Sequence, residues 1–400
     1  MQKISLFPTH IGDYDNVTTM CFDETNAPKA GIIRRDTKSP VIDNYEMIYS
    51  GPHIYISNPL YKSPRSKCIN KADYDIIDLE KSKRGFIQRT NYVPNIPLSD
   101  YKVLIRGFCI NDTLHKYDNY LDYYKVGIRA MINQAGERSL ICAVFPKKTA
   151  HINGIISTAF RRGYDAVDMT ALCSSLVLDF YIKSVAAQNL RYSRLASFPI
   201  GVAEKYQSAM YSRTLLLNCL TVHYADLWQS CWRPEYAHEE WSHSDPRLKP
   251  FTGLTEEWTW DTPLRNYFER RQALVEIDVL AAMALGLSLK DLELIYTIQF
   301  PVLQQNENDT WYDAKGNIVF TCSSGLKGVG CERKEWESIR GNLSEDSMTY
   351  EGTEATYIHT IDPKKSEMYG GEQVTYYAPY TKCDRIADYR RAWAFFENRL

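Results

Sequence analysis

One stretch, residues 123–201, constrains the fold of this chain more than any other part of the sequence. Apolar and polar residues alternate over residues 139–145, which predicts a strand with one buried side. Residues 168–187 form an apolar run that predicts a buried helix. Lys147, Lys148 and His151 follow the predicted strand directly. A basic sheet rim held by a buried helix suits the binding of a charged polymer better than the enclosure of a small metabolite.

The composition is ordinary for a globular protein. The chain has 400 residues, of which 44% are hydrophobic and 24% charged, enough for two or three domains. The net charge is −2, so any binding of nucleic acid must rest on a local patch of cations rather than on the charge of the whole molecule. The 29 tyrosines suit both interfaces and base stacking.

Cysteine usage and hydropathy predict where the protein works. The ten cysteines include no C-x-x-C pair, which predicts reduced thiols and a cytoplasmic location. The first residues lack the apolar stretch of a secretory signal. No apolar run approaches the roughly eighteen residues of a membrane span, so we expect no membrane partner.

The sequence predicts an α+β protein of three parts. Residues 1–200 are expected to form a mixed, β-rich domain, because short apolar segments are separated by prolines and turn residues. Residues 201–300 are expected to form a helical arm, with helical patterns over 204–232, 263–285 and 288–299, the last opened by a capping box at Ser288 and Asp291. Residues 301–400 are expected to form a small α+β segment, with a hairpin over 312–320 and a closing helix over 385–398.

Cations gather at a few places where they could contact phosphates or base edges. A proline-stiffened loop after Tyr61 holds three of them, and the turn at 89–94 mixes a cation, an amide and an aromatic ring. Further cations bracket the strand predicted over 139–145 and precede the buried helix. As a set, the best candidates for contact with DNA are Lys62, Arg65, Lys67, Arg89, Asn91, Arg129, Arg138, Lys147, Lys148, His151, Arg161 and Arg162.

The segment Asn58-Pro59-Leu60-Tyr61 is similar to the N-P-P-Y motif with which adenine methyltransferases hold a flipped base. Two features count against catalysis here. Leu60 stands in the place of the second proline, and residues 1–57 contain no glycine-rich G-x-G turn for a cofactor. We therefore predict no catalytic residue and no cofactor in this chain. A degenerate methyltransferase that uses this motif stays as an alternative.

Residue spacing gives little support to metal or nuclease chemistry. His238 and His243 are five residues apart, so on a helix they would point about 140° apart. Cys322 and Cys331 lack the second pair that a zinc ribbon needs. The E-x-K at residues 332–334 is a pattern common in charged proteins. No metal ligand is therefore predicted.

Two carboxylates, Glu276 and Asp278, lie in an apolar helical run and look catalytic at first glance. Carboxylates on a packed helix more often pair with arginines. We expect them to bind Arg270, Arg271 or an arginine from a neighbouring element.

Several patterns occur together in an order that resembles one enzyme family. They are E-R-S-L-I-C-A-V-F-P at 137–146, A-L-C-S-S-L followed by D-F at 171–180, N-P-L-Y-K-S-P-R at 58–65, and R-Q-A-L-V-E-I-D followed by A-L-G-L at 271–287. This order is similar to that of the C-terminal target-recognition region of γ-type adenine-N6 DNA methyltransferases. These are the type IIG family of restriction–modification and phage-defence systems.

The resemblance implies that residues 1–200 recognise a specific sequence in double-stranded DNA. A methyltransferase catalytic domain or subunit would be the partner, and S-adenosylmethionine is expected there rather than in this chain. A protein-interaction or structural module that never binds DNA is the alternative. If Arg65, Arg129, Lys147, Lys148 and Arg161 cluster on one concave face, DNA binding is favoured; if they are scattered, the alternative is.

Overall fold

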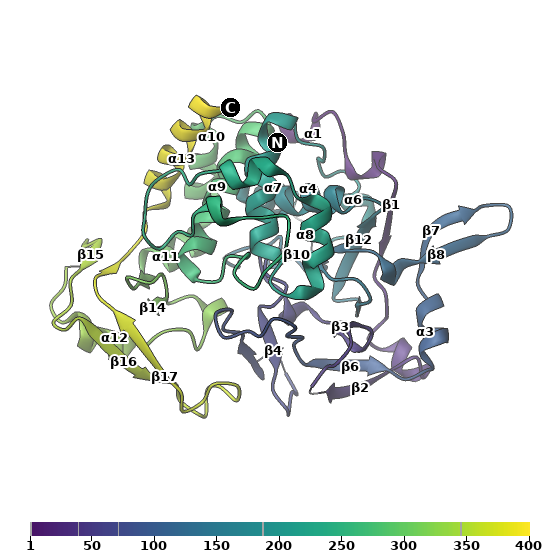
Figure 1. Ribbon diagram of the computed structural model, residues 1–400, viewed down its shortest axis with the longest axis horizontal. Helices are drawn as coiled ribbons and strands as arrows, with labels where there is room; N and C mark the ends of the chain where they lie inside the picture. The colour runs from purple at the N-terminus through teal and green to yellow at the C-terminus, as the bar shows by residue number, and fades with distance from the viewer. Residues whose placement is uncertain (1, 39, 71, 186–187, 345) are drawn as a thin grey trace.

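The computed structural model describes the whole chain except residues 1, 39, 71, 186–187 and 345. Helices are combined with strands that form several small sheets, which confirms the predicted α+β class. In Figure 1 the longer helices occupy the centre and top of the molecule, and the small sheets lie below them and at both sides.

The central sheet has four antiparallel strands in the order β1-β12-β9-β10. They are β1 (Asn16–Thr19), β12 (Ile155–Phe160), β9 (Lys125–Arg129) and β10 (Cys142–Phe145). Gly127 is required for packing, because a Cβ there would lie 2.2 Å from the ring of Phe145. The strand predicted over 139–145 begins only at Cys142, because the amide of Ser139 donates to Asp179 rather than to a strand.

The buried helix predicted over 168–187 is two helices, α4 (Gly163–Ser174) and α5 (Leu176–Ser184). Ser175 between them is extended, and its side chain accepts from the amide of Leu178. The break frees the amide of Leu176, which donates to the buried carboxylate of Asp278 at 2.7 Å. A helix N-terminus favours negative charge, so the break creates a place for a carboxylate in the core. Residues 186–187 lie outside the described residues.

The helices expected as an arm pack in the middle of the molecule (Figure 1). Their buried side chains belong to one core that extends from Ile4 to Phe396 and includes α4 and α5. The run predicted over 204–232 is two helices, whereas the capping box at Ser288 is confirmed. Among the described residues, no helix has both the length and the apolar character that a membrane crossing requires. The helices of this layer are α7 (Glu204–Asn218), α8 (Ala225–Cys231), α9 (Tyr267–Ala284), α10 (Leu289–Gln299), α11 (Pro301–Asn308) and α13 (Arg385–Arg399).

Short helices and two-stranded sheets from the first two hundred residues surround the central sheet. One hairpin, β7–β8, projects from the right-hand side in Figure 1. The sheets are β2 (Ile33–Lys38) with β6 (Thr90–Pro94), β3 (Ile48–Tyr49) with β11 (Ala150–His151), β4 (Lys62–Pro64) with β5 (Tyr74–Ile76), and β7 (Arg106–Asn111) with β8 (Lys116–Asn119). The helices are α1 (Gln2–Ser5), α2 (Asn26–Lys29), α3 (Leu98–Val103) and α6 (Tyr192–Leu195).

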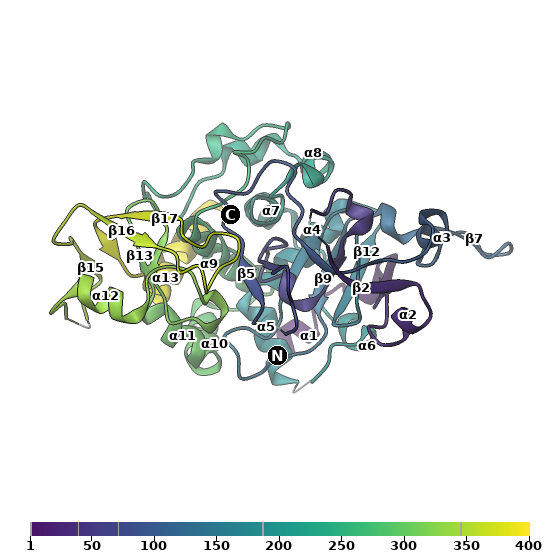
Figure 2. The same ribbon diagram turned by 90° about the horizontal axis from the view of Figure 1, so that it is seen from below.

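The C-terminal segment contains the predicted hairpin, β13 paired with β14, and the predicted closing helix α13. The strands β16 and β17 form a second hairpin whose loop, residues 361–372, reaches back to β4 and β5 (Figure 2). We name residues 361–372 the clasp loop. The further elements are β13 (Trp311–Tyr312), β14 (Ile318–Phe320), α12 (Arg333–Arg340), β15 (Thr349–Tyr350), β16 (Thr356–Thr360), β17 (Gln373–Tyr377) and β18 (Tyr380–Thr381).

Buried ion pairs connect the central helices. Glu276 binds Arg213 with Oε2 2.6 Å from Nε, and Asp278 binds Arg385 at 2.9 Å. Arg271 pairs with other acids, among them Glu307 at 2.9 Å. The expectation of arginines from neighbouring elements is therefore confirmed, while the pairing with Arg270 or Arg271 is wrong. A side chain on the same helix can reach only its own face, and here the carboxylates point to facing helices.

Candidate nucleic-acid interface

Three of the predicted cations, Lys147, Arg161 and Arg162, line one hollow of about 530 Å³ at an edge of the central sheet. The antiparallel register explains why they meet there. Residue 125 at the start of β9 pairs with Phe145 at the end of β10 and with residue 159 near the end of β12. Lys147 follows the end of β10 and Arg161 follows the end of β12, so both cations lie at the same end of these strands.

Each cation of the hollow has an acidic neighbour, and two of the three pairs are exposed on both sides. Lys147 lies 2.8 Å from Asp226, and Arg161 lies 2.6 Å from Asp15. Arg162 pairs with an aspartate three residues later, and its own side chain is 73% exposed. Exposed ion pairs of this kind contribute little to stability, because water screens both charges. A phosphate group could therefore replace the acidic partners at small cost.

Aromatic rings complete the hollow, and sequence reasoning missed them. Tyr123, Tyr124 and Tyr164 line it beside the cations. The ammonium of Lys147 lies 5.0 Å from the ring centroid of Tyr124. The signal was present as a pair of tyrosines directly before the β9 segment. Cations interleaved with aromatic rings are the combination that nucleic-acid grooves use.

Two of the four cations of the 62–67 loop and the 89–94 turn hold the clasp loop. Arg65 donates through Nε to Asp75 at 2.8 Å and through its terminal nitrogen to the carbonyl of Lys365. Arg89 forms an ion pair with Glu367. These arginines lie in contacts within the molecule, away from the hollow.

Three lysines of the predicted set have different surroundings. Lys62 lies over the ring of Tyr61, and burial lowers the pKa of its ammonium to about 8. Lys67 is exposed. Lys148 is exposed as well, in a left-handed backbone conformation (φ 72°), and its ammonium lies 5.5 Å from the ring centroid of Tyr45.

Two predicted contact residues, Arg138 and His151, lie in the interior instead. Arg138 donates to Asp179 at 2.7 Å and to the carbonyl of Ser174 at 2.8 Å. His151 is fully buried, with Nε2 2.6 Å from the hydroxyl of Ser157. Burial lowers the pKa of His151 to about 3, so its ring is neutral near pH 7. Neither side chain can reach a ligand on the surface, and we remove both from the interface.

Asn91 and Arg129 also support the fold. Asn91 is buried and donates to the hydroxyl of Tyr74 at 2.7 Å. Arg129 donates to the carbonyls of Gly51 and Ile54 at 2.8 and 2.5 Å. Arg129 therefore holds the turn that leads to the 58–61 motif, and neither residue shares the hollow of Lys147.

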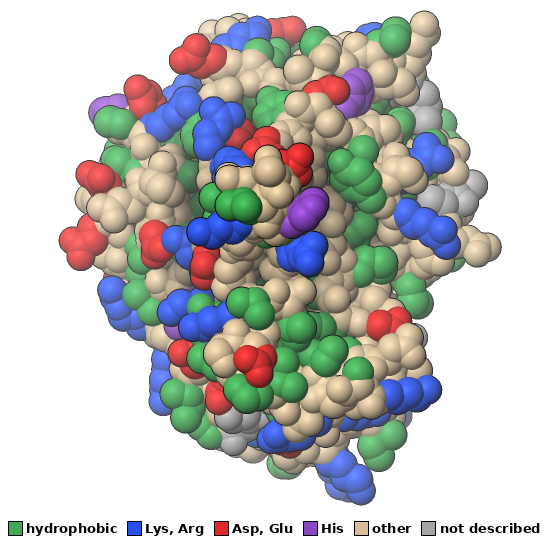
Figure 3. Space-filling model, turned by 90° about the vertical axis from the view of Figure 1, so that its right-hand side faces the viewer, with side chains coloured by type: hydrophobic (Ala, Val, Ile, Leu, Met, Phe, Trp, Pro, Cys, Tyr) green, Lys and Arg blue, Asp and Glu red, His purple; other side chains and the backbone are tan. Residues whose placement is uncertain are grey.

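The five cations whose clustering would favour DNA binding are only partly clustered. Lys147 and Arg161 share a concave surface. Arg65 and Arg129 lie elsewhere and are engaged within the molecule, and Lys148 lies beside Tyr45 outside the hollow. Figure 3, which shows the side of the molecule with hairpin β7–β8, has Lys and Arg side chains interspersed with Asp and Glu rather than one continuous basic field. The cationic surface that remains is small.

The motif at residues 58–61 forms a tight turn beside a cavity of about 170 Å³. Asn58 accepts from the amide of Leu60 at 3.0 Å, and the hydroxyl of Tyr61 donates to the carbonyl of Gly325. Both side chains thus have partners within the chain. Pockets that enclose ligands of drug size are roughly 300–1,000 Å³, so this cavity is small for a cofactor.

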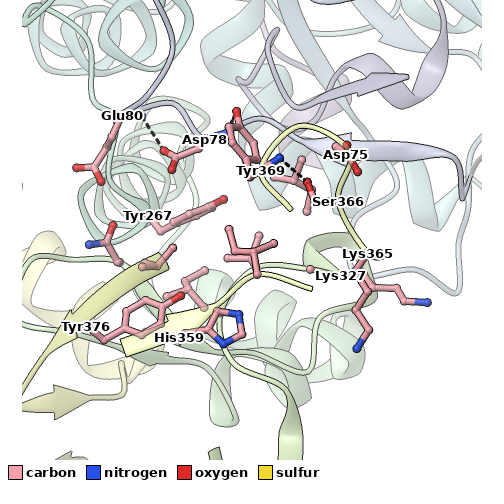
Figure 4. A pocket seen from close by; sticks show the side chains of 18 of the residues that line it. Asp75, Asp78, Glu80, Tyr267, Lys327, His359, Lys365, Ser366, Tyr369 and Tyr376 are labelled. Carbon is pink, nitrogen blue, oxygen red and sulfur yellow. Dashed lines mark hydrogen bonds between the residues drawn. The ribbon is translucent and has the colours of Figure 1, made fainter. Parts of the chain in front are cut away.

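A second cavity, of about 110 Å³, lies between the β5 segment and the clasp loop. Figure 4 shows Asp75 and Asp78 above it, Lys327 and Lys365 at one side, and His359 below. Among the described residues, one group brings three potential metal ligands together, namely Cys331, Glu335 and His359. Sequence spacing missed this group because His359 comes from a separate strand.

Comparison with known proteins identifies no relative: no protein-family model matches the chain, and no curated protein matches it significantly.

Proposed function

We propose that this chain recognises a specific sequence in double-stranded DNA as the target-recognition part of an adenine-N6 DNA methyltransferase. A separate catalytic domain or subunit would bind S-adenosylmethionine and methylate the base. The observation that carries the proposal is the hollow in which Lys147, Arg161 and Arg162 meet three tyrosines. The sequence resemblance supplies the class of enzyme, and a restriction–modification or phage-defence system is the setting it implies.

The geometry suits the phosphate backbone better than base edges. The hollow's cations come from two strand ends and therefore keep a fixed spacing, whereas the acidic partners of Lys147 and Arg161 are exposed and replaceable. Contacts to phosphates set register and orientation, and base contacts set sequence choice. We expect binding by the isolated chain to be weak and dependent on salt.

The experiment compares salt dependence in two triple variants. In the first, Lys147, Arg161 and Arg162 are changed to Ala; in the control, the exposed residues Lys205, Lys290 and Lys334 are changed to Ala. Both variants lose the same charge. Each phosphate contact contributes about one unit to the slope of log affinity against log salt. Measured between 50 and 200 mM salt, this slope should therefore be about three units shallower in the first variant than in the parent chain. Fluorescence anisotropy with a labelled duplex measures both.

An equal change of slope in the two variants would mean that DNA affinity depends on net charge alone. No binding at the lowest salt would reject the proposal.

A second measurement addresses the cofactor. Calorimetry with S-adenosylmethionine should show no heat of binding for the isolated chain. Micromolar binding would favour the degenerate methyltransferase that uses Asn58 and Tyr61.

One observation favours a docking surface for the catalytic subunit. Helix α3 and hairpin β7–β8 expose several large apolar side chains within seventeen residues, which is a common mark of a protein-contact surface. Changing two of them, Ile110 and Leu114, to Ser should leave DNA affinity intact and weaken a pull-down of the catalytic subunit. The exposed side chains are Leu98, Val103, Leu104, Ile110 and Leu114.

A further inference from the structure

We infer that the C-terminal segment binds one zinc-like dication through Cys331, Glu335 and His359. Their ligating atoms, a sulfur, a carboxylate oxygen and an imidazole nitrogen, all lie within 4.8 Å of one another. Thiolate, carboxylate and imidazole are the side-chain ligands of zinc in proteins. This site is separate from the hollow of Lys147 and does not depend on DNA binding.

The glycine-rich turn after β14 delivers the thiol. Gly330 has a positive φ of 76°, and a Cβ there would lie 2.6 Å from the carbonyl of Val319, so only glycine fits. The next amide, that of Cys331, donates to the same carbonyl at 2.6 Å. The sulfur is thereby placed at the start of α12. Glu335 follows four residues later, in the first turn of that helix.

The strand β16 supplies the third ligand. Tyr357 and His359 are two residues apart, so they lie on the same face of the strand. Nδ1 of His359 is 2.9 Å from both carboxylate oxygens of Glu335. The hydroxyl of Tyr357 donates to one of those oxygens at 2.8 Å. Groups that hold a ligating carboxylate from behind are typical of metal sites, and Tyr357 has that position.

Burial and charge suit a bound dication. Cys331 is 5% exposed, while the side chains of His359 and Glu335 are 12% and 24% exposed. The site is thus sheltered, with parts of the His359 and Glu335 side chains still exposed. A thiolate and a carboxylate would together balance a charge of +2. Three protein ligands leave a fourth position for water, and His359 borders the cavity of Figure 4, from which water could reach it.

The bound ion would tie hairpin β16–β17 to α12. The hairpin carries the clasp loop, whose Glu367 and Lys365 contact Arg89 and Arg65. The competing explanation is a hydrogen-bonded cluster in which Glu335, His359 and Tyr357 satisfy one another without an ion. The two explanations differ in metal stoichiometry and in the role of the thiol, so both quantities decide between them.

The experiment titrates the metal-stripped full chain under reducing conditions with Co²⁺ and then with Zn²⁺. We expect one equivalent of Co²⁺, with an absorption band from thiolate-to-cobalt charge transfer that Zn²⁺ removes. Binding should also raise the melting temperature, because the ion binds the folded chain. In Cys331→Ser the charge-transfer band should vanish. Tyr357→Phe should keep the band and weaken affinity roughly 10–100-fold.

Cys322→Ser is the matched control, because this nearby thiol donates to the carbonyl of Gln305 and lies outside the group. Its titration should equal that of the parent chain. The inference is overturned if the parent chain takes up no Co²⁺, if the band survives Cys331→Ser, or if Cys322→Ser removes it. Because stoichiometry and band are measured first on the parent chain, the result does not depend on whether a variant folds.

Discussion

The protein uses the same pairing, a cation with a carboxylate, in two regions with opposite consequences. Among the central helices, Arg213 and Glu276 are fully shielded from solvent at 2.6 Å. At the hollow, Lys147 and Asp226 lie at a similar 2.8 Å, but their side chains are 40% and 65% exposed. The distances are alike, so the two pairs differ in their exposure to solvent. The buried cation is committed to the fold, and the exposed one is available to a ligand.

The comparison shows why a cation's position in the sequence says little about its role. Arg138 and Lys147 flank the short strand β10. Arg138 forms a buried ion pair with Asp179, whereas Lys147 lines the hollow. Removing one member of a buried pair leaves an uncompensated charge in the interior. Removing one member of an exposed pair leaves a charge that water can solvate.

The largest effect is expected for Arg213→Met. This change leaves Glu276 unpaired in the core and also removes a cation that lies against the rings of Trp241, Phe251 and Phe396. Loss of one partner of a buried pair costs about 3–5 kcal/mol of unfolding free energy, measurable by urea denaturation. The double change with Glu276→Met should recover most of the loss. A loss below about 1 kcal/mol would make the core pair equivalent to a surface pair.

The next effect is a dependence on acid. Burial alone would raise the pKa of Glu307, but the guanidinium groups of Arg385 and Arg271 outweigh it and hold that pKa at about 2, below the ordinary 4.5. The stabilisation is therefore complete above pH 4.5 and is lost as pH falls towards 2. Urea midpoints at several acidic pH values should decline steeply in the parent chain and less in Glu307→Gln. Identical profiles would remove Glu307 as the source.

A smaller effect is expected at Arg65, outside both regions, where a partly exposed cation binds a buried carboxylate. In Arg65→Ala the buried carboxylate of Asp75 loses its charged partner while keeping the amides of Glu367 and Met368. A buried group that loses a hydrogen-bond partner costs about 1–3 kcal/mol. Because Asp75 also holds the clasp loop, that loop should become sensitive to limited proteolysis. Exposed Lys67→Ala is the control. If target choice relaxes in the assembled methyltransferase while stability stays unchanged, Arg65 reads a base instead.

The smallest effect on stability belongs to the hollow. Lys147→Ala should change the unfolding free energy by at most about 1 kcal/mol, because its partner Asp226 is exposed. The same variant should flatten the salt slope of DNA affinity by about one unit. A stability loss comparable with that of Arg213→Met would mean that Lys147 is a structural residue. The comparison of the two regions would then fail.

Local signals in the sequence predicted local structure. The capping box at Ser288 and the hairpin at 312–320 depend on neighbours in sequence, and both are present. The break at Ser175 could not be predicted, because it places Leu176 against Asp278, more than one hundred residues later. Apolar periodicity indicates that a segment is buried, but not which distant side chain interrupts it.

The same limit applies to the candidate sites. Two cations after strand ends were identified as candidates, and the antiparallel register brings them together. Arg138 and His151 were misplaced, because their burial is decided by Asp179 and Ser157 from other elements. The group at Cys331 was missed, because spacing rules search for ligands within one short segment.

The clasp loop has a consequence for how the protein is made. Arg65 and Lys365 touch each other although they are 300 residues apart in sequence. A ribosome that adds 5–20 residues per second needs roughly 15–60 s to synthesise the intervening chain. During that time β4 and β5 are translated, but the loop that covers them does not yet exist. The surface around Asp75 is therefore completed only after the clasp loop has been synthesised, and chaperones and proteases have access to this part of the chain during that interval.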